Sequence, residues 1–338
     1  MKGLAKLSLW ILLTLLVSCN HHELCYHHPH TAQVQVNVDW SEFVEEQPTG
    51  MTVMVYPADG SKPYSSLTHT LDHASFNLPE GMYHTLVFNQ SVSEFGSLEF
   101  RQMETYDKAE VVSSTEDSHW YEARAEGGRV VRQSEWIATH REESKSVTRQ
   151  MVEELRPEGK YRTGDVGGYV LSNLVPHNII YTIHVRVYIE GIYNLRSARA
   201  ALDGLAEGYR FAAARPSDVT ATYLMEEWKL TIDENDPTRG HIDTDLYCFG
   251  LPYGHRGTAE ENLFELSVLL VDNKTILDFP FMVGDKFESG DANVRLQLNL
   301  ELTLTDPLPD VKPEGGSGSG FDAVVEDWGE EIEHDVQM

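Results

Sequence analysis

Residues 296–304 read Leu-Gln-Leu-Asn-Leu-Glu-Leu-Thr-Leu, an unbroken alternation of leucine with polar side chains. Successive side chains of a β-strand point to opposite faces, so the five leucines share one face of a single strand. Such a face must cover a core, and fully burying each leucine contributes roughly 1.5–3 kcal/mol. The stretch therefore predicts a half-buried strand of a β-sheet protein.

The same period of two recurs on the N-terminal side of this stretch. It is clearest at 34–38, 51–55 and 182–189, and Val147–Leu155 is a further short candidate. Asp272-Asn273-Lys274 has the composition of a hairpin turn between two more strands. Many short strands, separated by turn signals about every 8–20 residues, predict an all-β fold of antiparallel sandwiches.

One segment departs from the strand pattern. Ser197–Tyr209 has apolar side chains at helical spacing, and Ser197 is a suitable N-cap, although Gly204 weakens a helix. We therefore expect at most one short helix or helical turn, which would cross between the sheets of the second domain.

A change of composition divides the chain. Residues 156–168 are rich in glycine and proline, which is typical of a boundary between domains. We expect two tandem antiparallel β-sandwiches, an N-terminal one at 32–157 and a C-terminal one at 158–311.

The first residues have the features of an export signal. Lys2 and Lys6 precede the apolar run Leu7 to Val17, which is too short for an ordinary transmembrane helix of about 20 residues. The run ends in Leu16-Val17-Ser18-Cys19, which resembles the bacterial lipobox, in which the cysteine is acylated and the peptide is cut before it.

The lipobox resemblance implies three short segments before the first sandwich. They are a signal peptide at 1–18, a lipid on Cys19, and a tether at 19–31. Several acyl chains hold a protein stably on a membrane where a single chain does not. The alternative is a simple secretory signal in which Cys19 is incidental.

The charge balance limits the partners. The formal net charge is −28, and removing residues 1–18 makes it two units more negative because their only charges are Lys2 and Lys6. This argues against nucleic acid or an anionic membrane surface as a partner, since both need a basic footprint. It fits a solvated cell-surface protein.

The search for chemistry finds no enzyme motif, and we expect no catalytic residue, cofactor or metal site. The tether holds five histidines and Cys25, which could bind a transition metal, but a polar spacer is the favoured interpretation. Cys248 lies in a strand pattern, so we expect a packed thiol; a disulfide with Cys25 stays open. The acidic stretch around Pro237 lacks EF-hand spacing and reads as a solvated loop, with a weak calcium site as the alternative.

Three aromatic residues leave a sugar-binding role open. Trp120, Tyr121 and Trp136 could stack on a sugar ring, but their alternation with other residues favours packing in a core or at its rim.

The C-terminal segment, 312–338, begins with a linker and ends in acidic residues. Gly315-Gly-Ser-Gly-Ser-Gly320 precedes the apolar octet 321–328, and seven acidic residues lie in 321–338 without any Lys or Arg. We expect the octet to dock as a β-strand, either on its own sheet edge or on another subunit. The candidate docking side chains are Phe321, Ala323, Val325 and Trp328.

These features together resemble the fimbrillin superfamily, the lipoprotein pilus subunits and anchors of Bacteroidales, and more narrowly a fimbrillin-like lipoprotein family. The resemblance rests on the lipobox cysteine, the tandem sandwiches, the terminal Phe-x-x-x-Val-x-x-Trp strand, and two internal runs. The runs are Leu78-Pro-Glu-Gly-Met-Tyr83 through Phe88-Asn89, and Tyr188-Ile-Glu-Gly-Ile192 with Arg199-Ala-Ala-Leu-Asp-Gly-Leu205.

The resemblance implies a transthyretin-like N-terminal sandwich and a second sandwich that serve in surface adhesion or pilus assembly. It also implies a location in the cell envelope, lipid-anchored at the outer membrane and cell surface. No arginine cleavage site stands out between the early strands, which favours a permanently anchored protein over a polymerising stalk subunit.

Two further functions remain as alternatives. A glycan-binding surface lipoprotein would need an exposed aromatic platform with flanking carboxamides. An unrecognised hydrolase would need paired carboxylates or a metal site in a cleft between the domains.

Overall fold

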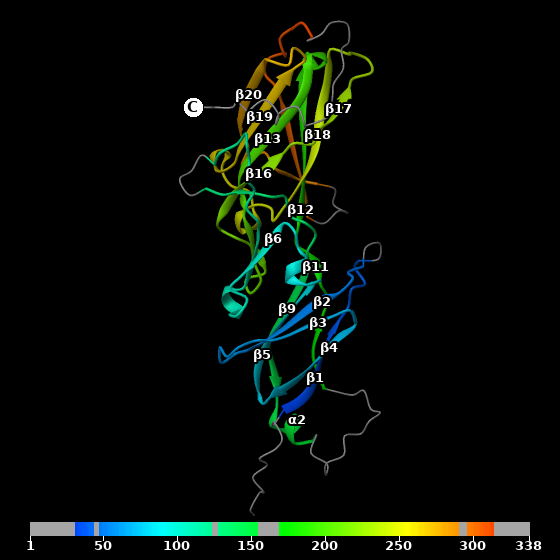
Figure 1. Cartoon of the computed structure of the whole chain (residues 1–338), viewed down its shortest axis with the longest axis vertical. Helices are drawn as coiled ribbons and strands as arrows, with labels where there is room; N and C mark the ends of the chain where they lie inside the picture. The colour runs from blue at the N-terminus through cyan, green and yellow to red at the C-terminus, as the bar shows by residue number, and fades with distance from the viewer. Residues whose placement is uncertain (1–30, 44–46, 124–127, 155–168, 291–295, 314–338) are drawn as a thin grey trace, which may run out of the picture.

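The computed structural model describes residues 31–43, 47–123, 128–154, 169–290 and 296–313. Two β-rich halves are stacked end to end in an elongated molecule (Figure 1). The first strand lies at one end, and the sandwich formed by the later strands lies at the other. The predicted all-β fold class is confirmed.

The first half is a sandwich of two sheets with the orders β10-β1-β4 and β11-β9-β5-β2-β3. Their facing sides share one core, which includes Val34 and Val36 of the first sheet and Val53 and Val55 of the second. The strands are β1 (Thr31–Val38), β2 (Met51–Pro57), β3 (Tyr64–Thr68), β4 (His73–Pro79), β5 (Gly81–Asn89), β9 (Ala138–Val147), β10 (Tyr169–Leu174) and β11 (His177–Asn178).

The second half is a sandwich of two five-stranded sheets with the orders β17-β18-β12-β22-β21 and β20-β19-β13-β16-β8. Among the described strands, three pairings are parallel, namely β1–β10, β12–β22 and β16–β8, and the other pairs are antiparallel. The strands are β8 (Val130–Val131), β12 (Tyr181–Glu190), β13 (Leu195–Ala206), β16 (Thr220–Met225), β17 (Lys229–Ile232), β18 (Arg239–Cys248), β19 (Leu263–Leu270), β20 (Ile276–Met282), β21 (Glu288–Ser289) and β22 (Gln297–Thr303).

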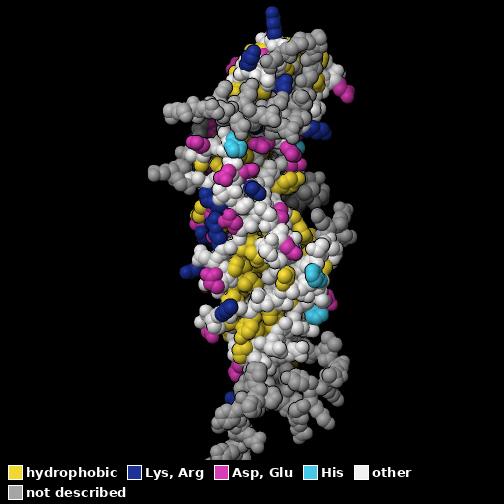
Figure 2. All heavy atoms as spheres, viewed as in Figure 1, with side chains coloured by type: hydrophobic (Ala, Val, Ile, Leu, Met, Phe, Trp, Pro, Cys, Tyr) yellow, Lys and Arg dark blue, Asp and Glu magenta, His cyan; other side chains and the backbone are white. Residues whose placement is uncertain are grey.

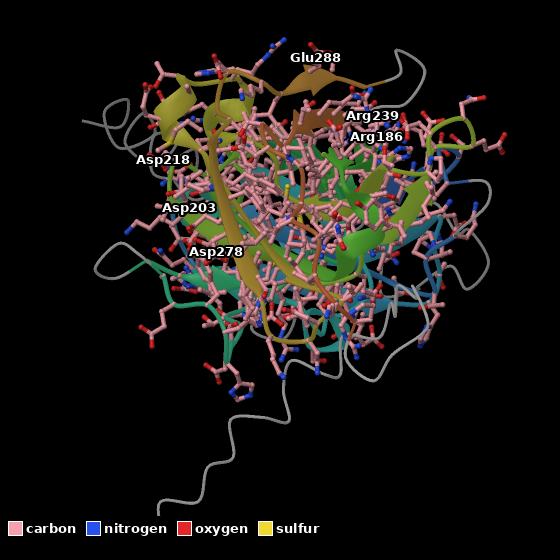
Figure 3. All side chains as sticks on the ribbon, turned by 90° about the horizontal axis from the view of Figure 1, so that it is seen from above. Arg186, Asp203, Asp218, Arg239, Asp278 and Glu288 are labelled. Atoms are coloured by element: carbon pink, nitrogen blue, oxygen red, sulfur yellow. The ribbon has the colours of Figure 1, made fainter. Side chains whose placement is uncertain are left out.

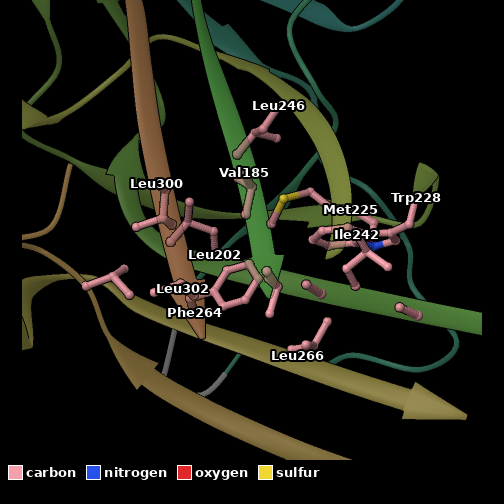
Figure 4. Close-up of a cluster of buried hydrophobic side chains, with 14 of the residues drawn as sticks. Val185, Leu202, Met225, Trp228, Ile242, Leu246, Phe264, Leu266, Leu300 and Leu302 are labelled. Carbon is pink, nitrogen blue, oxygen red and sulfur yellow. The ribbon is translucent and has the colours of Figure 1, made fainter. Parts of the chain in front are cut away.

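The leucine-rich stretch forms β22, as predicted. Leu300, Leu302 and Leu304 are buried in the core of the second sandwich, and Figure 4 shows the first two beside Val185 and Phe264. Leu298 is only half-buried. Leu296 is not a core residue, because it precedes the strand in a left-handed conformation with φ 61°.

The expected helix at Ser197–Tyr209 is wrong, because this segment is β13 and its continuation β14. β13 is the central strand of its sheet, and both of its faces are covered. Ala200 and Leu202 face the sandwich core, whereas Ala201 packs under Trp120 and Tyr121 on the outer face. A strand buried on both faces loses the polar alternation that identifies a strand in sequence, so apolar residues fall at helical spacing by chance.

The expected strand at Val147–Leu155 is also wrong beyond its first residue. Val147 ends β9, and α2 (Arg149–Glu154) is the only α-helix in the described parts of the chain. Thr148 starts the helix by accepting the Met151 N–H at 3.3 Å on its hydroxyl, and Val152 is buried against the first core. Five short 3-10 turns complete the regular structure: η1 (Val92–Glu94), η2 (Tyr106–Lys108), η3 (Ile192–Asn194), η4 (Pro252–Gly254) and η5 (Ala259–Glu261).

The predicted domain boundary near residue 157 lies outside the described residues. On its C-terminal side, β10 pairs with β1 and β11 pairs with β9. Residues 169–178 therefore belong by hydrogen bonding to the sheets of the first half.

A shared sheet and a shared core fix the two halves to each other. The sheet β15-β14-β7-β6 joins strands from both halves. Behind it, Leu86 and Phe88 of the first half pack in one cluster with Phe211 and Phe249 of the second. Hydrophobic side chains are visible along this middle region in Figure 2. The strands of the joining sheet are β6 (Leu98–Arg101), β7 (Glu110–Ser113), β14 (Gly208–Arg210) and β15 (Arg215–Pro216).

A buried carboxylate reinforces the junction. Glu207 is 5% exposed, and its two oxygens accept from Arg101 at 3.2 Å and from Arg129 at 2.5 Å. Arg101 belongs to β6, so its ion pair joins the same segments as the shared sheet, whereas Arg129 directly precedes β8 of the second sandwich.

The outer faces of the second sandwich are polar on both sides. Arg186 and Arg239 lie on one side of the molecule, and Asp203 and Asp278 lie on the other (Figure 3). The Arg186 Nε donates to Asp243 at 2.6 Å, and this hydrogen bond raises the pKa of Arg186.

Candidate functional site

The predicted site residues Cys19, Phe321, Ala323, Val325 and Trp328 lie outside the described residues. The structure does describe the segments that adjoin them and the sheet edges to which a docking strand could add. These edges lie on one long side of the second sandwich, between β20 and β22.

β20 forms the first edge of this open side. It pairs with β19 along its length, and no other described strand pairs with it. Its inward side chains Leu277, Phe279 and Phe281 pack on the core but remain half-buried. Backbone donors and acceptors on an unpaired edge are a template for an added strand.

β22 forms the second edge. β21 pairs with it only at Leu298 and Asn299, so residues 300–303 have no pairing on that edge among the described strands. Leu298 and Val311 also pack half-buried on the core. The open side therefore combines two free strand edges with the five half-buried side chains Leu277, Phe279, Phe281, Leu298 and Val311.

The last described residues are fixed at the end of the sandwich where β20 begins. The Leu308 N–H donates to the Glu190 carbonyl at 2.8 Å. Asp310 accepts the Tyr193 hydroxyl at 2.5 Å and the Asn194 amide at 3.0 Å, and these hydrogen bonds lower the pKa of Asp310.

A glycine makes this attachment possible. A Cβ on Gly191 would lie 2.6 Å from the Leu308 carbonyl oxygen, and Gly191 has φ 76°, a conformation that favours glycine. A strand turning back from this point would run antiparallel to β22 and parallel to β20, because β22 runs towards this end and β20 runs away from it.

The sequence holds one feature that marks β20 as an edge strand. Pro280 lies inside β20 opposite Glu265, and proline within a strand is typical of an edge. The hairpin turn predicted at Asp272-Asn273-Lys274 leads into this strand, and Pro280 marks it as an edge strand.

The three aromatic residues considered for sugar binding do not form one platform. The Trp120 ring lies under the Arg199 guanidinium at 4.4 Å and its Nε1 donates to Glu226 at 2.5 Å. Trp136 belongs to the first core instead, where it packs edge-on against Phe43 at 5.2 Å.

Cys248 and the acidic loop around Pro237 make structural contacts. Cys248 is fully buried, burial raises the pKa of its thiol to about 12, and the Gly250 N–H donates to its sulfur at 3.3 Å. The proposed disulfide partner Cys25 lies outside the described residues. In the acidic loop, Asp236 accepts from the Thr238 hydroxyl at 2.5 Å, which lowers its pKa.

The described ranges lack the features of a metal centre and of a helical membrane span. They contain no group of three or more His, Cys, Asp or Glu side chains placed to hold a metal ion. None of their helices is long and apolar enough to span a membrane.

The chain belongs to the family described as a domain of unknown function, DUF5119, which it matches over residues 18–226. A search of curated proteins finds no match.

The chain is similar to several solved structures at low sequence identity. A proposed adhesin from Bacteroides ovatus aligns with a TM-score of 0.55 at 13% identity, over 87% of this chain and 99% of that one. The fimbrial anchor protein Mfa2 from Porphyromonas gingivalis aligns with a TM-score of 0.44 at 13% identity, over 81% and 90% of the two chains. A proposed polysaccharide-binding protein from Bacteroides thetaiotaomicron aligns with a TM-score of 0.44 at 9% identity, over 80% and 90%.

These proteins are described in terms of adhesion, fimbriae and polysaccharide binding, and they come from Bacteroides and Porphyromonas. The likeness to the Bacteroides ovatus structure extends over nearly the whole of that protein, so the two share a fold. The all-β fold with more than one domain that the resemblance implied is confirmed.

Proposed function

We propose that this protein is a cell-envelope lipoprotein, anchored by a lipid on Cys19, that acts in surface adhesion or pilus assembly. It acts as a structural and interaction protein, and it is not an enzyme. Its location is the outer membrane and cell surface. The fold shared with a proposed Bacteroides ovatus adhesin supports this role.

The observation that carries the proposal is the placement of the two ends. β1 begins at Thr31, at one end of an elongated body, while the last described residues attach at the opposite end near η3 (Figure 1). The shared sheet and core hold the halves in line between them. A lipid at Cys19 would keep the first half near the membrane and present the second sandwich away from it.

The partners we propose are the membrane, through the lipid, and other fimbrial subunits, through strand addition. A subunit's octet 321–328 would add to the open side of a neighbour's second sandwich. Main-chain hydrogen bonds would supply affinity, and alternate side chains would lie over the half-buried residues of β20 and β22.

The anchor is tested by detergent partitioning. The full-length protein should enter the detergent phase, and Cys19→Ala should move it to the aqueous phase, because acyl chains supply the membrane affinity. Cys25→Ala is the matched control and should partition like the native protein. Unchanged partitioning of Cys19→Ala would overturn the lipoprotein assignment. Protease shaving of intact cells then reports whether the anchored protein faces outward.

Strand addition is tested by deleting residues 321–338. A donated strand predicts a monomer of unchanged stability that no longer binds its partner subunit. A loss of monomer stability would instead indicate that the octet docks on its own sandwich. A truncated protein with full stability and every interaction would contradict both forms of docking.

A further inference from the structure

Two of the parallel strand pairings join the ends of the described chain to one continuous segment. β1, the first described strand, pairs in parallel with β10, and β22, the last described strand, pairs in parallel with β12. β10 and β12 both belong to residues 169–190, which the structure describes without a gap. This segment passes from the first half into the second, and Figure 1 shows it in green.

The strand directions place the two ends of the described chain at opposite ends of the molecule. β1 runs from Thr31 towards the junction, because its last residue, Val38, pairs with Leu174, and the chain leads from Leu174 into β11 and β12. β22 runs away from the junction, because Leu308, beyond its end, binds Glu190 at the end of β12. A tensile force between the two ends therefore acts along the axes of β1 and β22.

Such a force would strain both pairings in shear. β1 would be pulled from its first residue, while β10 is held from its last residue by the chain that leads to β12. In the same way, β12 is held from its first residue and β22 would be pulled from its last. Hydrogen bonds between paired strands cross from one strand to the other along the whole pairing. Shear strains all of these bonds together, whereas two strands pulled apart from one end lose their bonds one after another.

The force would cross the junction through the backbone. Residues 175–180 join β10 to β12 covalently, and Ile179 and Ile180 are buried in the cluster that the two halves share. The Ile179 N–H also donates to the Ile137 carbonyl at 3.1 Å. The shared sheet and the shared core therefore need only keep the halves in line, and the two parallel pairings resist the force.

The pairing of β22 is the weaker of the two. β1 is paired on both edges, with β4 along residues 31–37 and with β10 along residues 34–38. β22 pairs with β12 along residues 297–303, but β21 covers only residues 298 and 299 of its other edge. We therefore expect β22 to leave its sheet before β1 does.

We propose that this protein carries tensile force between its membrane anchor and a bound partner subunit, and that the β1–β10 and β12–β22 pairings resist this force. The inference rests on the proposed function, because the lipid on Cys19 would hold one end of the chain and a donated octet 321–328 would pull on the other. The mechanical resistance itself depends only on the described strands.

The test is single-molecule force spectroscopy of the full-length chain in two pulling directions. Handles on Gln33→Cys and Lys312→Cys pull along the proposed path, and handles on Glu190→Cys and Lys312→Cys pull β22 and β12 apart from one end. All three positions are exposed. We expect the first pair of handles to give a mean unfolding force about two- to sevenfold higher. The upper limit corresponds to equal sharing of the force over the seven residues of β22.

The native thiols do not interfere with the handles. Both proteins carry Cys19→Ser and Cys25→Ser, and the third cysteine, Cys248, is fully buried. Because Cys19→Ser removes the lipid site and no partner subunit is present, the force measurement is independent of the proposed function. Failure of the anchor appears in detergent partitioning, and failure of the mechanical proposal appears only in the unfolding force.

Two buried leucines separate resistance to force from stability. Leu300 lies on β22, and Leu246 lies on β18, on the other side of β12; both are fully buried in the second core. Leu300→Ala and Leu246→Ala should lower stability in urea to a similar extent. Forced unfolding depends on the unfolding barrier, and only contacts that are lost before the barrier change it. Only Leu300→Ala should therefore lower the unfolding force along the proposed path.

Two results would overturn the proposal. One is an equal unfolding force for the two pairs of handles, since the same strands would then resist both directions alike. The other is an equal effect of Leu300→Ala and Leu246→Ala on the force. The comparison of the two pulling directions keeps every core side chain, so it tests the proposal even if a leucine variant does not fold.

Discussion

The two long sides of the second sandwich are closed differently. On one side the chain passes directly from β16 into β17, Trp228 fills the space between the sheets, and β8 extends the sheet edge. On the other side, Val283 and Phe287 close only the end where β22 begins, and the edges of β20 and β22 beyond it remain unpaired by described strands. The closed side stabilises the fold. An added strand would complete the open side, and the proposed interaction therefore lies there.

The largest loss of stability should come from removing the side chain that fills the closed side. Trp228 is 7% exposed, and its Nε1 donates to the Met225 carbonyl at 3.3 Å. Trp228→Ala should destabilise the second sandwich by about 3–5 kcal/mol, since it removes a buried aromatic side chain and leaves a cavity. Urea denaturation measures the loss. Tyr247→Ala, an aromatic truncation at a 44% exposed position, should cost less than about 1 kcal/mol. Equal losses of stability in the two variants would contradict the statement that Trp228 stabilises the closed side.

Truncating a core side chain of β22, next to the open side, should give the next largest loss of stability. Leu300 is fully buried beside Val185 of β12, so Leu300→Ala should cost about 2–5 kcal/mol. Gln297→Ala, on the same strand but outside the core, should cost about 0.5 kcal/mol or less. Thermal and urea denaturation measure both. If the two variants lost equal stability, the assignment of the leucine face to the core would be wrong.

The difference between β22 and β13 explains which strands could be predicted from the sequence. β22 has one polar face, so its leucines alternate and the strand is evident. β13 is covered on both faces by residues from distant parts of the chain, including Trp120. Nothing local to Ser197–Tyr209 reveals that cover, and its apolar spacing therefore fits a helix.

Only part of the candidate site leaves a local pattern in the sequence, for the same reason. The lipobox and the apolar octet are local patterns, so the sequence alone points to Cys19 and Phe321. The open side depends on which strands remain unpaired, which is set by pairings such as β12 with β22 across more than 100 residues. The joining sheet likewise depends on strands from both halves.

Substitution of Phe279 should lower the stability of the protein less than the two changes above, but it should strongly weaken binding of the added strand. This side chain is half-buried on the open side, so Phe279→Ala should cost about 1–3 kcal/mol, less than a fully buried phenylalanine. Binding of a synthetic 321–338 peptide to the protein truncated after residue 320 should weaken about tenfold, because an apolar contact of the added strand is lost. Met282→Ala, 50% exposed at the end of the same strand, is the control and should bind normally. Equal binding by both variants would argue against docking at the open side.

The smallest effect should be a local dependence on pH at the end of the described chain. Hydrogen bonds from Tyr193 and Asn194 lower the pKa of Asp310 below its usual 3.8. Because the folded-state pKa is depressed, the stabilisation is present above pH 3.8 and is lost as the pH falls through the lower, folded value. Protonation weakens the hold on the segment that carries the Leu308 N–H, which donates to Glu190. Hydrogen exchange, corrected for intrinsic rates, should therefore show Leu308 protection falling below about pH 4. Asp310→Asn keeps an acceptor oxygen but cannot titrate, so its Leu308 protection should not change with pH in this range. A matching fall in protection in Asp310→Asn would assign the pH dependence to another group.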